Sequence, residues 1–452
     1  MLARDPAAED HGSPYFWHPM AHPAEPAGQS QFVVASAEGV HITDREGRRC
    51  LDGTSGGLSV VNLGYSATPI KRAMAEQLDR LPYFAAFGKS SNPNAEALSR
   101  RLIEDVFGAD GMQRVFFTSG GGDSVETALR LARQYWKLEK QHDRYKFIAL
   151  RNGYHGTHFG GASLNSRATV RRPYEPLLAG CFHIPTPWTY RNPFDERDPE
   201  RLGALCARLL DEEIQFQGPD TVAAFIAEPV TGAGGLVVPP PNFWPLVREV
   251  CNKHGVLLIA DEVVTAFGRT GHETGCRGYG VKPDMMTTAK AITSGYFPLG
   301  ATLINGRIAE AFERSNDRLG LIGHGYSYAG HPVGCAAGLA ALQMTLDLRI
   351  WENARARGEQ LMNGLQRLHQ KHAIVGDVRG KGLMATLEIV SDRRSKAPGD
   401  KSLLTRIGDG VLAAGVLVRV SGSNINVSPP LIAQGEHIDQ IIDALDRALG
   451  AS

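Results

Sequence analysis

The feature that most constrains the fold is a series of short apolar runs separated by longer segments of helical character. Beyond about residue 70 the runs cover residues 115–117, 147–150, 222–227, 256–260 and 301–304, and the last three are nearly all apolar. A strand that is apolar on both faces must be covered on both, which is typical of parallel strands between helices. The alternation therefore predicts an α/β fold with a mostly parallel central sheet.

The two ends of the chain differ from this middle part. Residues 39–44 and 48–52 alternate around a glycine-containing turn, which predicts a small hairpin. After His331-Pro332 come two amphipathic stretches, 334–348 and 351–372, followed by strand-like segments at 383–389 and 416–420. For 452 residues we expect a large domain over 70–332 and a smaller α+β domain over 333–452, which the segment 1–69 joins.

Charge and cysteine usage exclude several classes of protein. Lys plus Arg and Asp plus Glu both number 48, so no basic surface for nucleic acid or anionic membrane is expected. Residues 1–14 contain no apolar signal region, and no run approaches the about 18 apolar residues of a membrane span. Six cysteines without a Cys-x-x-Cys pair indicate free thiols, and we expect a cytoplasmic protein: Cys50, Cys181, Cys206, Cys251, Cys276 and Cys335.

Three short motifs fail on their spacing or context. Gly88-Lys89-Ser90 lacks the glycine that a phosphate-binding P-loop needs at position 83, and Gly120-Gly121-Gly122 lacks the last glycine of a dinucleotide fingerprint. His155 and His158 lie among glycines, with no carboxylate or cysteine close in sequence. Hydrogen-bonding loop histidines are favoured over a metal site.

An acidic pair and a lone lysine follow the apolar runs. Asp261-Glu262 ends the strand at 256–260, at the carboxyl edge where open α/β sheets bind ligands. Asp261 is therefore a candidate functional carboxylate, with a helix N-cap as the alternative. Lys290 has small and apolar neighbours, so its pKa could be lowered to suit Schiff-base formation; a surface lysine is the alternative.

Two further features at the same sheet edge complete a set. Residues 115–129 read as strand, glycine-rich turn and helix start, whose exposed backbone N–H groups suit a phosphate. Tyr154 follows the strand at 147–150 and offers a ring that could stack on a planar cofactor. A phosphate site, a stacking ring, a carboxylate and a desolvated lysine together suit pyridoxal 5'-phosphate (PLP).

With these motifs in hand, the chain resembles the class III aminotransferases of the fold-type I PLP enzymes, especially the ω-amino acid and amine:pyruvate transaminases. The resemblance covers nearly the whole chain. It implies a fold-type I PLP-dependent transferase with a large domain and a smaller α+β domain. Six motifs carry it in the family's order: the Gly120 turn, Tyr154-His155-Gly156, Glu228-Pro229-Val230, Asp261-Glu262-Val263, Ala289-Lys290 and Tyr328-Ala329-Gly330-His331-Pro332.

The resemblance implies roles for individual residues. Lys290 would form the Schiff base with the cofactor and move the proton, and Asp261 would keep the pyridine nitrogen protonated. Val263, two residues further along an extended segment, would pack on one ring face and Tyr154 on the other. The remaining implied cofactor residues are Gly121 and Gly122 at the phosphate, Glu228, and Ser327, which would reach the neighbouring subunit's phosphate and so require a homodimer or larger homo-oligomer.

Three positions depart from the family's usual pattern. Gly122 stands where a phosphate-binding hydroxyl is usual, so backbone amides must carry more of the phosphate. Ser327 stands in place of threonine and keeps the hydroxyl. Ser59 replaces a tryptophan found in many pyruvate-dependent relatives, which predicts a wider wall of the substrate pocket.

The resemblance also bears on the substrates. Asn426 occupies the position of the carboxylate-binding arginine of ornithine and 4-aminobutyrate transaminases, whereas Arg419 matches the flexible arginine of the amine:pyruvate enzymes. We therefore expect ping-pong transfer from a primary amine or ω-amino acid to pyruvate, with 2-oxoglutarate as the alternative acceptor. A PLP decarboxylase or aminomutase of the same fold would share every cofactor residue.

Overall fold

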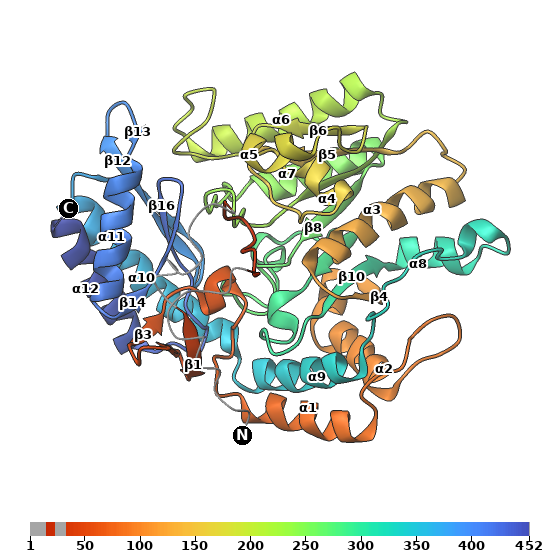
Figure 1. Ribbon diagram of the computed structural model, residues 1–452. Helices are drawn as coiled ribbons and strands as arrows, with labels where there is room; N and C mark the ends of the chain where they lie inside the picture. The colour runs from red at the N-terminus through yellow and green to blue at the C-terminus, as the bar shows by residue number, and fades with distance from the viewer. Residues whose placement is uncertain (1–14, 23–32, 452) are drawn as a thin grey trace.

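A computed structural model describes residues 15–22 and 33–451. The polar segment 1–14, which we expected to carry no signal sequence, lies outside the described residues. Figure 1 shows a large central sheet with helices on both sides, and a smaller unit in which the chain beyond about residue 350 lies beside the first strands. The predicted α/β fold with a mostly parallel sheet is confirmed.

The central sheet has seven strands in the order β4-β10-β9-β8-β7-β5-β6. Neighbours from β9 to β6 pair in parallel, whereas β10 is antiparallel to both β4 and β9. The carboxyl ends of the parallel strands therefore share one edge. The bounds are β4 Met112–Thr118, β5 Lys146–Leu150, β6 Cys181–Ile184, β7 Val222–Ala227, β8 Leu257–Asp261, β9 Met285–Thr288 and β10 Gly300–Asn305.

Helices bury both faces of this sheet, which explains the nearly continuous apolar strands. All six residues of β7 and all five of β8 are buried. The long α3 turns Val125, Ala128 and Ala132 toward one face, while α6 and α7 contribute to the apolar core on the other. The helices of this part are α2 Pro93–Arg101, α3 Gly121–Leu138, α4 Phe159–Leu164, α5 Ala168–Arg171, α6 Pro199–Gln217, α7 Phe243–His254 and α8 Gly306–Glu313.

Two strands of the central sheet were not predicted from the sequence. These are β6 and β9, each of only four residues. Met285-Met286-Thr287-Thr288 shows neither alternation nor a purely apolar run, so no two-residue period marks it as a strand. Its position matters because β9 leads directly into Lys290.

A second apolar core combines the two ends of the chain. It draws on residues between Val40 and Ile70 and on residues between Ala337 and Leu449. The expected hairpin is present as β2 and β3, and β3 also pairs in parallel with β14. The domain division stays a prediction, and its first boundary, at residue 70, falls inside α1.

The elements around this second core form two small sheets and their helices. The four-stranded sheet has the order β1-β2-β3-β14, and the other sheet the order β11-β12-β16-β15, with β13 beside β12. The strands are β1 Val34–Glu38, β2 His41–Asp44, β3 Arg49–Asp52, β11 Val375–Gly380, β12 Ala385–Asp392, β13 Ala397–Pro398, β14 Val416–Leu417, β15 Arg419–Ser421 and β16 Asn424–Val427. The helices are α1 Thr68–Arg80, α9 Pro332–Asp347, α10 Ile350–Lys371, α11 Lys401–Ala413 and α12 Gly435–Gly450.

Short helical turns complete the chain. They are η2 Ser55–Ser59, η3 Leu102–Val106, η4 Phe107–Asp110, η5 Arg172–Tyr174, η6 Arg277–Tyr279, η7 Lys290–Ile292 and η8 Arg318–Gly320. Within the described ranges no single helix is long and apolar enough to cross a membrane; only α9 and α10 taken together reach that length and hydropathy, and they are bent by 63°.

Asp284 ties two strands of the central sheet, β8 and β10, to the helices α7 and α8, and this arrangement leads to a stability prediction. One carboxylate oxygen accepts from the backbone N of Leu258 (2.8 Å) and from Arg248 Nη1 (2.9 Å). The other accepts from Asn305 Nδ2 (3.0 Å) and Arg307 Nη2 (3.1 Å).

We expect Asp284→Ala to lower the free energy of unfolding by about 3 kcal/mol, because it leaves a buried amide and a desolvated arginine unpaired. The measurement is the thermal unfolding temperature of the protein. Asp79→Ala, at an exposed carboxylate, is the control and should change little. Equal unfolding temperatures for the two variants would contradict the assignment.

Candidate active site

Asp261 and Lys290 lie at neighbouring strand ends. Asp261 is the last residue of β8 and stands opposite Thr287 of β9 in parallel register. Lys290 follows two residues after β9 and begins a short helical turn with a left-handed φ of 45°. Parallel pairing of β8 with β9 thus brings the carboxylate and the amine to the same edge of the sheet.

Asp261 is 4% exposed and nearly saturated with hydrogen bonds. Oδ1 accepts from Val263 N (3.2 Å) and Thr287 Oγ1 (3.1 Å), and Oδ2 lies 2.7 Å from His155 Nδ1. The first of these bonds caps a turn; no helix begins directly after β8, so Asp261 is not the helix N-cap of the alternative interpretation. A carboxylate has about four acceptor positions, which leaves one for a further donor.

His155 is the hydrogen-bond partner of Asp261 Oδ2 and orients the carboxylate. Its ring is fully buried, and although burial alone lowers the pKa of His155, the hydrogen bond and charge of Asp261 outweigh it and raise that pKa. Asn165 Oδ1 accepts from His155 N (2.6 Å) and holds the loop in place. His155 and His158 are both loop residues, as expected, but each contacts a carboxylate that is remote in sequence, Asp261 and Asp123 respectively.

Lys290 has the desolvated environment that the sequence analysis predicted. Burial lowers the pKa of Lys290 to about 8, although the charges of Asp261 and Glu228 act in the opposite direction. Arg419 and Arg269 add to the lowering. A neutral amine is therefore accessible near neutral pH, which a surface lysine would not provide.

Glu228 joins the loop of Tyr154 to this cluster. Its carboxylate is 7% exposed and accepts from Tyr154 N (3.1 Å) and Gly232 N (2.8 Å). Burial raises the pKa of Glu228 to about 7, and the charge of Asp261 contributes. Burial also raises the pKa of Tyr154. The charges of Asp261 and Glu228 act in the same direction, and that of Arg419 acts in the opposite direction.

The start of α3 lies against the same strand ends. No side chain caps this helix, whose N-cap is Gly120. A Cβ on Gly121 would come within 2.9 Å of Val263 Cγ1, and Ser124 Oγ donates to Thr288 O (3.1 Å). The expectation that Val263 continues an extended segment is wrong, because β8 ends at Asp261 and Val263 lies in a turn. That turn nevertheless presses Val263 against the glycines.

The three remaining predicted residues lie outside the hydrogen bonds around Asp261. Ser59 ends the turn η2, and its Oγ lies 2.8 Å from Ser428 Oγ. Arg419 is exposed on β15, opposite Asn426 of β16. Ser327 is exposed as well; its carbonyl accepts from Tyr83 Oη (2.7 Å), and it takes no part in the hydrogen bonds around Asp261.

Arg269 was missed entirely by the sequence analysis. Its side chain is fully buried, and burial lowers the pKa of Arg269 to about 9. The guanidinium donates to Ser55 Oγ (3.0 Å), Asn62 Oδ1 (2.5 Å), Leu383 O (2.8 Å) and Pro429 O (2.6 Å). It thereby holds the segments of Ser59 and Ser428 together, and nothing local in the sequence marks such a role.

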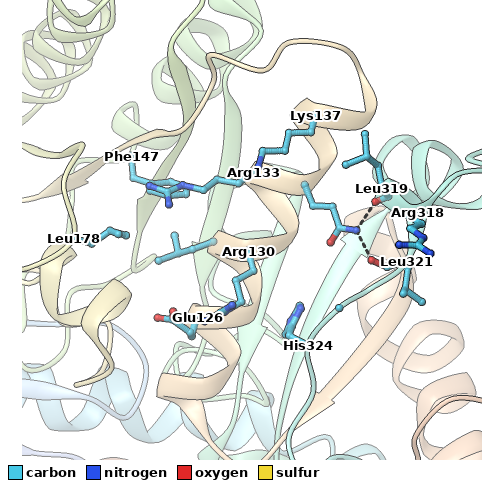
Figure 2. Close-up of a pocket in the computed structure, with 13 residues that line it drawn as sticks. Glu126, Arg130, Arg133, Lys137, Phe147, Leu178, Arg318, Leu319, Leu321 and His324 are labelled. Atoms are coloured by element: carbon cyan, nitrogen blue, oxygen red, sulfur yellow. Dashed lines mark hydrogen bonds and ion pairs between the residues drawn. The ribbon is translucent and has the colours of Figure 1, made fainter.

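A cavity of about 490 Å³ lies elsewhere, between α3 and the segment 318–324. Figure 2 shows Arg133 of α3 reaching toward Phe147, whereas Leu319 and His324 lie on the other side of this helix. None of the predicted site residues lines it. Within residues 15–22 and 33–451 no group of three or more His, Cys, Asp or Glu side chains could hold a metal ion.

Comparisons with known proteins decide the family. Residues 24–449 match the family "Aminotransferase class-III". The chain belongs to the class III aminotransferases. The family's enzymes depend on PLP, so this chain is a PLP-dependent aminotransferase of fold type I, and the resemblance inferred from the six motifs is confirmed.

Similar proteins include several transaminases. The putrescine–pyruvate aminotransferase of Pseudomonas aeruginosa is 34% identical over 92% of this chain and 90% of its own length. The diaminobutyrate–2-oxoglutarate transaminase of Halomonas elongata is 35% identical, with the same coverage. Among solved structures, a PLP-bound amine transaminase from an uncultivated Pseudomonas species is 47% identical, with a TM-score of 0.95 over 98% of this chain and 100% of the other.

The residues present suit PLP. The remaining acceptor position of Asp261 could take a protonated ring nitrogen, and Lys290 offers a desolvated amine at the adjacent strand end. The uncapped start of α3 leaves room for an anion beside Val263. These features face the same edge of the sheet.

The lowered pKa of Lys290 predicts how the apoprotein takes up its cofactor. Only the neutral amine reacts with the aldehyde of PLP, so the rate should rise with pH through a midpoint near 8 and level off above it. Glu228→Gln removes a charge that favours the ammonium form, so the midpoint should fall. After borohydride reduction, peptide mapping should find the adduct on Lys290, also in the control Lys282→Ala; a midpoint above 10 or another labelled lysine would refute this.

Replacing Asp261 tests whether its charge acts in the reaction. Asp261→Asn keeps the shape and can still cap the turn, but it loses the charge that favours protonation of the cofactor ring. We expect turnover to fall by roughly a factor of 100 to 1,000, with Lys290 still labelled by PLP. Turnover close to that of the parent enzyme would show that Asp261 only caps the turn and orients His155.

Proposed function

We propose that this aminotransferase moves an amino group from a primary amine or ω-amino acid to a keto acid, with pyruvate as acceptor, by a ping-pong mechanism. The observation that carries the proposal is the cluster of a desolvated Lys290 and the buried Asp261 with an arginine, Arg419, that has no carboxylate partner among the described residues. The 34% identity to a putrescine–pyruvate aminotransferase supports both the donor class and the acceptor.

Each residue of the cluster has a task that its surroundings permit. When bound, PLP supplies an electron sink for the substrate's reacting carbon. Lys290 Nζ would hold the cofactor, and as a neutral amine it would take the proton from that carbon and return it. Asp261, oriented by His155, holds the proton on the ring nitrogen through its free acceptor position.

Other residues orient the cofactor and the substrate. Val263 would pack on one face of the ring and Tyr154 on the other, while Gly121 and Gly122 would offer backbone N–H groups to the phosphate. Glu228 holds the Tyr154 loop through its bond to Tyr154 N. Ser59, held against Ser428, forms a wall of the substrate pocket.

Arg419 is the proposed binding group for the acceptor's carboxylate. Partial burial lowers the pKa of Arg419, as does the nearby charge of Arg167, so this guanidinium would gain from an anionic partner. Its exposed place at the start of β15 lets the side chain turn away for an uncharged donor. Asn426, directly across the strand pair, cannot take over the ion pair.

One observation favours the alternative acceptor. Arg167 is the N-cap of α5, and its charge acts on Arg419, so a second cation lies near Arg419. A dicarboxylate such as 2-oxoglutarate could use both, and the identity to a diaminobutyrate–2-oxoglutarate transaminase accords with this. A decarboxylase or aminomutase would need no keto acid at all, which separates it by assay.

Two further parts of the proposal concern assembly and location. Ser327 lies on an exposed loop, where it could reach the phosphate bound by a partner subunit, so the active form would be a homodimer or a larger homo-oligomer. We propose a cytoplasmic enzyme, since the cysteines within the described residues are all unpaired.

A panel of amine donors with pyruvate and with 2-oxoglutarate tests the function, and Arg419 variants sharpen it. A charge-assisted contact is worth about 1.5 to 3 kcal/mol, so Arg419→Ala should raise the KM for pyruvate roughly ten- to a hundredfold. The KM for a simple amine donor should change little. Arg419→Lys should restore the KM for pyruvate only in part, since lysine lacks the planar guanidinium that binds a carboxylate through two hydrogen bonds.

The panel also decides between the alternatives. If pyruvate is the acceptor, Arg167→Gln should leave the KM for pyruvate unchanged. If both arginines bind a dicarboxylate, Arg167→Gln should raise the KM for 2-oxoglutarate. Equal effects of Arg419→Ala on donor and acceptor would make Arg419 structural. Activity without any keto acid would replace transamination by another PLP reaction.

A further inference from the structure

A short loop, residues 231–237, packs against the segment of Tyr154. Glu228, just before the loop, accepts from a backbone N–H of the loop (2.8 Å) and from Tyr154 N (3.1 Å). A Cβ on Gly234 would overlap Asn152 O, so the backbones of the two segments touch at this point. The position of the loop and that of Tyr154 therefore depend on each other.

Arg379 of β11 holds the other side of this loop. Its Nε donates to Gly235 O (2.9 Å) and to Leu236 O (3.1 Å). Its Nη2 donates to Asn424 Oδ1 of β16 (2.7 Å), and its Nη1 donates to Glu388 Oε2 of β12 (2.8 Å). The side chain is only 10% exposed. One guanidinium thus joins the loop to the sheet that β11, β12 and β16 share.

The register of this sheet places Arg379 and Arg419 on one face. Arg379 pairs with Thr386, and Thr386 pairs with Asn426. Asn426 in turn pairs with Arg419. Residues directly opposite each other in antiparallel strands point to the same face. The two arginines therefore stand in one row, at opposite edges of the sheet, and the bonds of Arg379 to the loop show that this face is turned toward the segment of Tyr154.

We propose that Arg379 is a positioning residue for the keto-acid acceptor: by fixing the loop 231–237 to the sheet of Arg419, it sets where the Arg419 guanidinium lies relative to the cofactor. The inference rests on the proposed role of Arg419 in binding the acceptor's carboxylate. Close-packed interiors transmit small shifts, and a binding group misplaced by about 1 Å can cost roughly a hundredfold in rate. A purely structural role, as counter-ion of Glu388, would not distinguish the acceptor from the donor.

The experiment measures the two halves of the ping-pong reaction separately, by the change in cofactor absorbance. Enzyme loaded with pyridoxamine 5'-phosphate is mixed with pyruvate, and enzyme loaded with PLP is mixed with a simple amine. Arg379→Lys keeps a cation beside Glu388 but cannot donate to the loop and to β16 at once. We expect the second-order rate constant for pyruvate to fall roughly tenfold, and that for the amine to change less than about twofold.

Two further variants serve as control and as a milder test. Asp377→Asn is the matched control, because Asp377 accepts from Arg379 Nη1 (2.7 Å) and the bonds from Arg379 to the loop do not involve it. Neither half-reaction should change. Asn424→Ala removes one acceptor of Arg379 and no charge, so it tests the inference even if Arg379→Lys does not fold. It should slow the pyruvate half-reaction alone, by roughly threefold.

A double variant tests whether Arg379 acts through Arg419. In the Arg419→Ala background there is no guanidinium left to misplace. Arg379→Lys should therefore cause no further loss with pyruvate in that background, although it does so in the parent enzyme. Such non-additivity is expected only if the two residues act on the same step.

Three results overturn the inference. Equal losses in both half-reactions would make Arg379 a general support of the fold, an unchanged rate with pyruvate would leave it without a role, and a loss that persists in the Arg419→Ala background would mean that it acts independently of Arg419. If Arg419→Ala alone left the pyruvate half-reaction unchanged, the proposed function would fail and the inference with it. That result is distinguishable, because it comes from a variant in which Arg379 is intact.

Discussion

The parallel pairing of β8 with β9 is the constraint on which the site depends. It sets Asp261 opposite Thr287 and so fixes the distance along the sheet edge between the carboxylate and Lys290. The neighbouring residues act on these two groups. His155 orients the carboxylate, and the charges of Glu228 and Asp261 partly offset the lowering of the Lys290 pKa by burial. The helix α3 begins beside both strand ends. A slip of one residue in this register would turn one of the two side chains to the other face.

Much of the fold can be predicted from the sequence because most of its strands and helix starts have local sequence patterns. Apolar runs mark the strands that are covered on both faces, and glycine-rich turns mark the start of α3. The prediction failed at β9, where four residues pair on both sides through partners remote in sequence and carry no local period. The strand that delivers Lys290 was therefore invisible, although Lys290 itself was found through its neighbours.

The parts of the site that sequence reasoning missed are those made by long-range contacts. His155 and Asp261 are 106 residues apart, and the partners of Arg269 come from segments up to 214 residues away. Carboxylates were sought close to the two histidines in sequence, whereas the fold supplies them across the sheet edge and from the start of α3. Proximity in space follows from topology, which no local motif contains.

The second apolar core has a consequence for the order in which the chain can fold during synthesis. Residues between Val40 and Ile70 emerge first from the ribosome, yet their packing partners extend to Leu449. At typical rates of about 5 to 20 residues per second, the apolar side chains near the N-terminus wait roughly 20 to 80 s for those partners. The central sheet can form meanwhile, so the early segment must either stay solvated or be shielded by a chaperone until the last helix, α12, arrives.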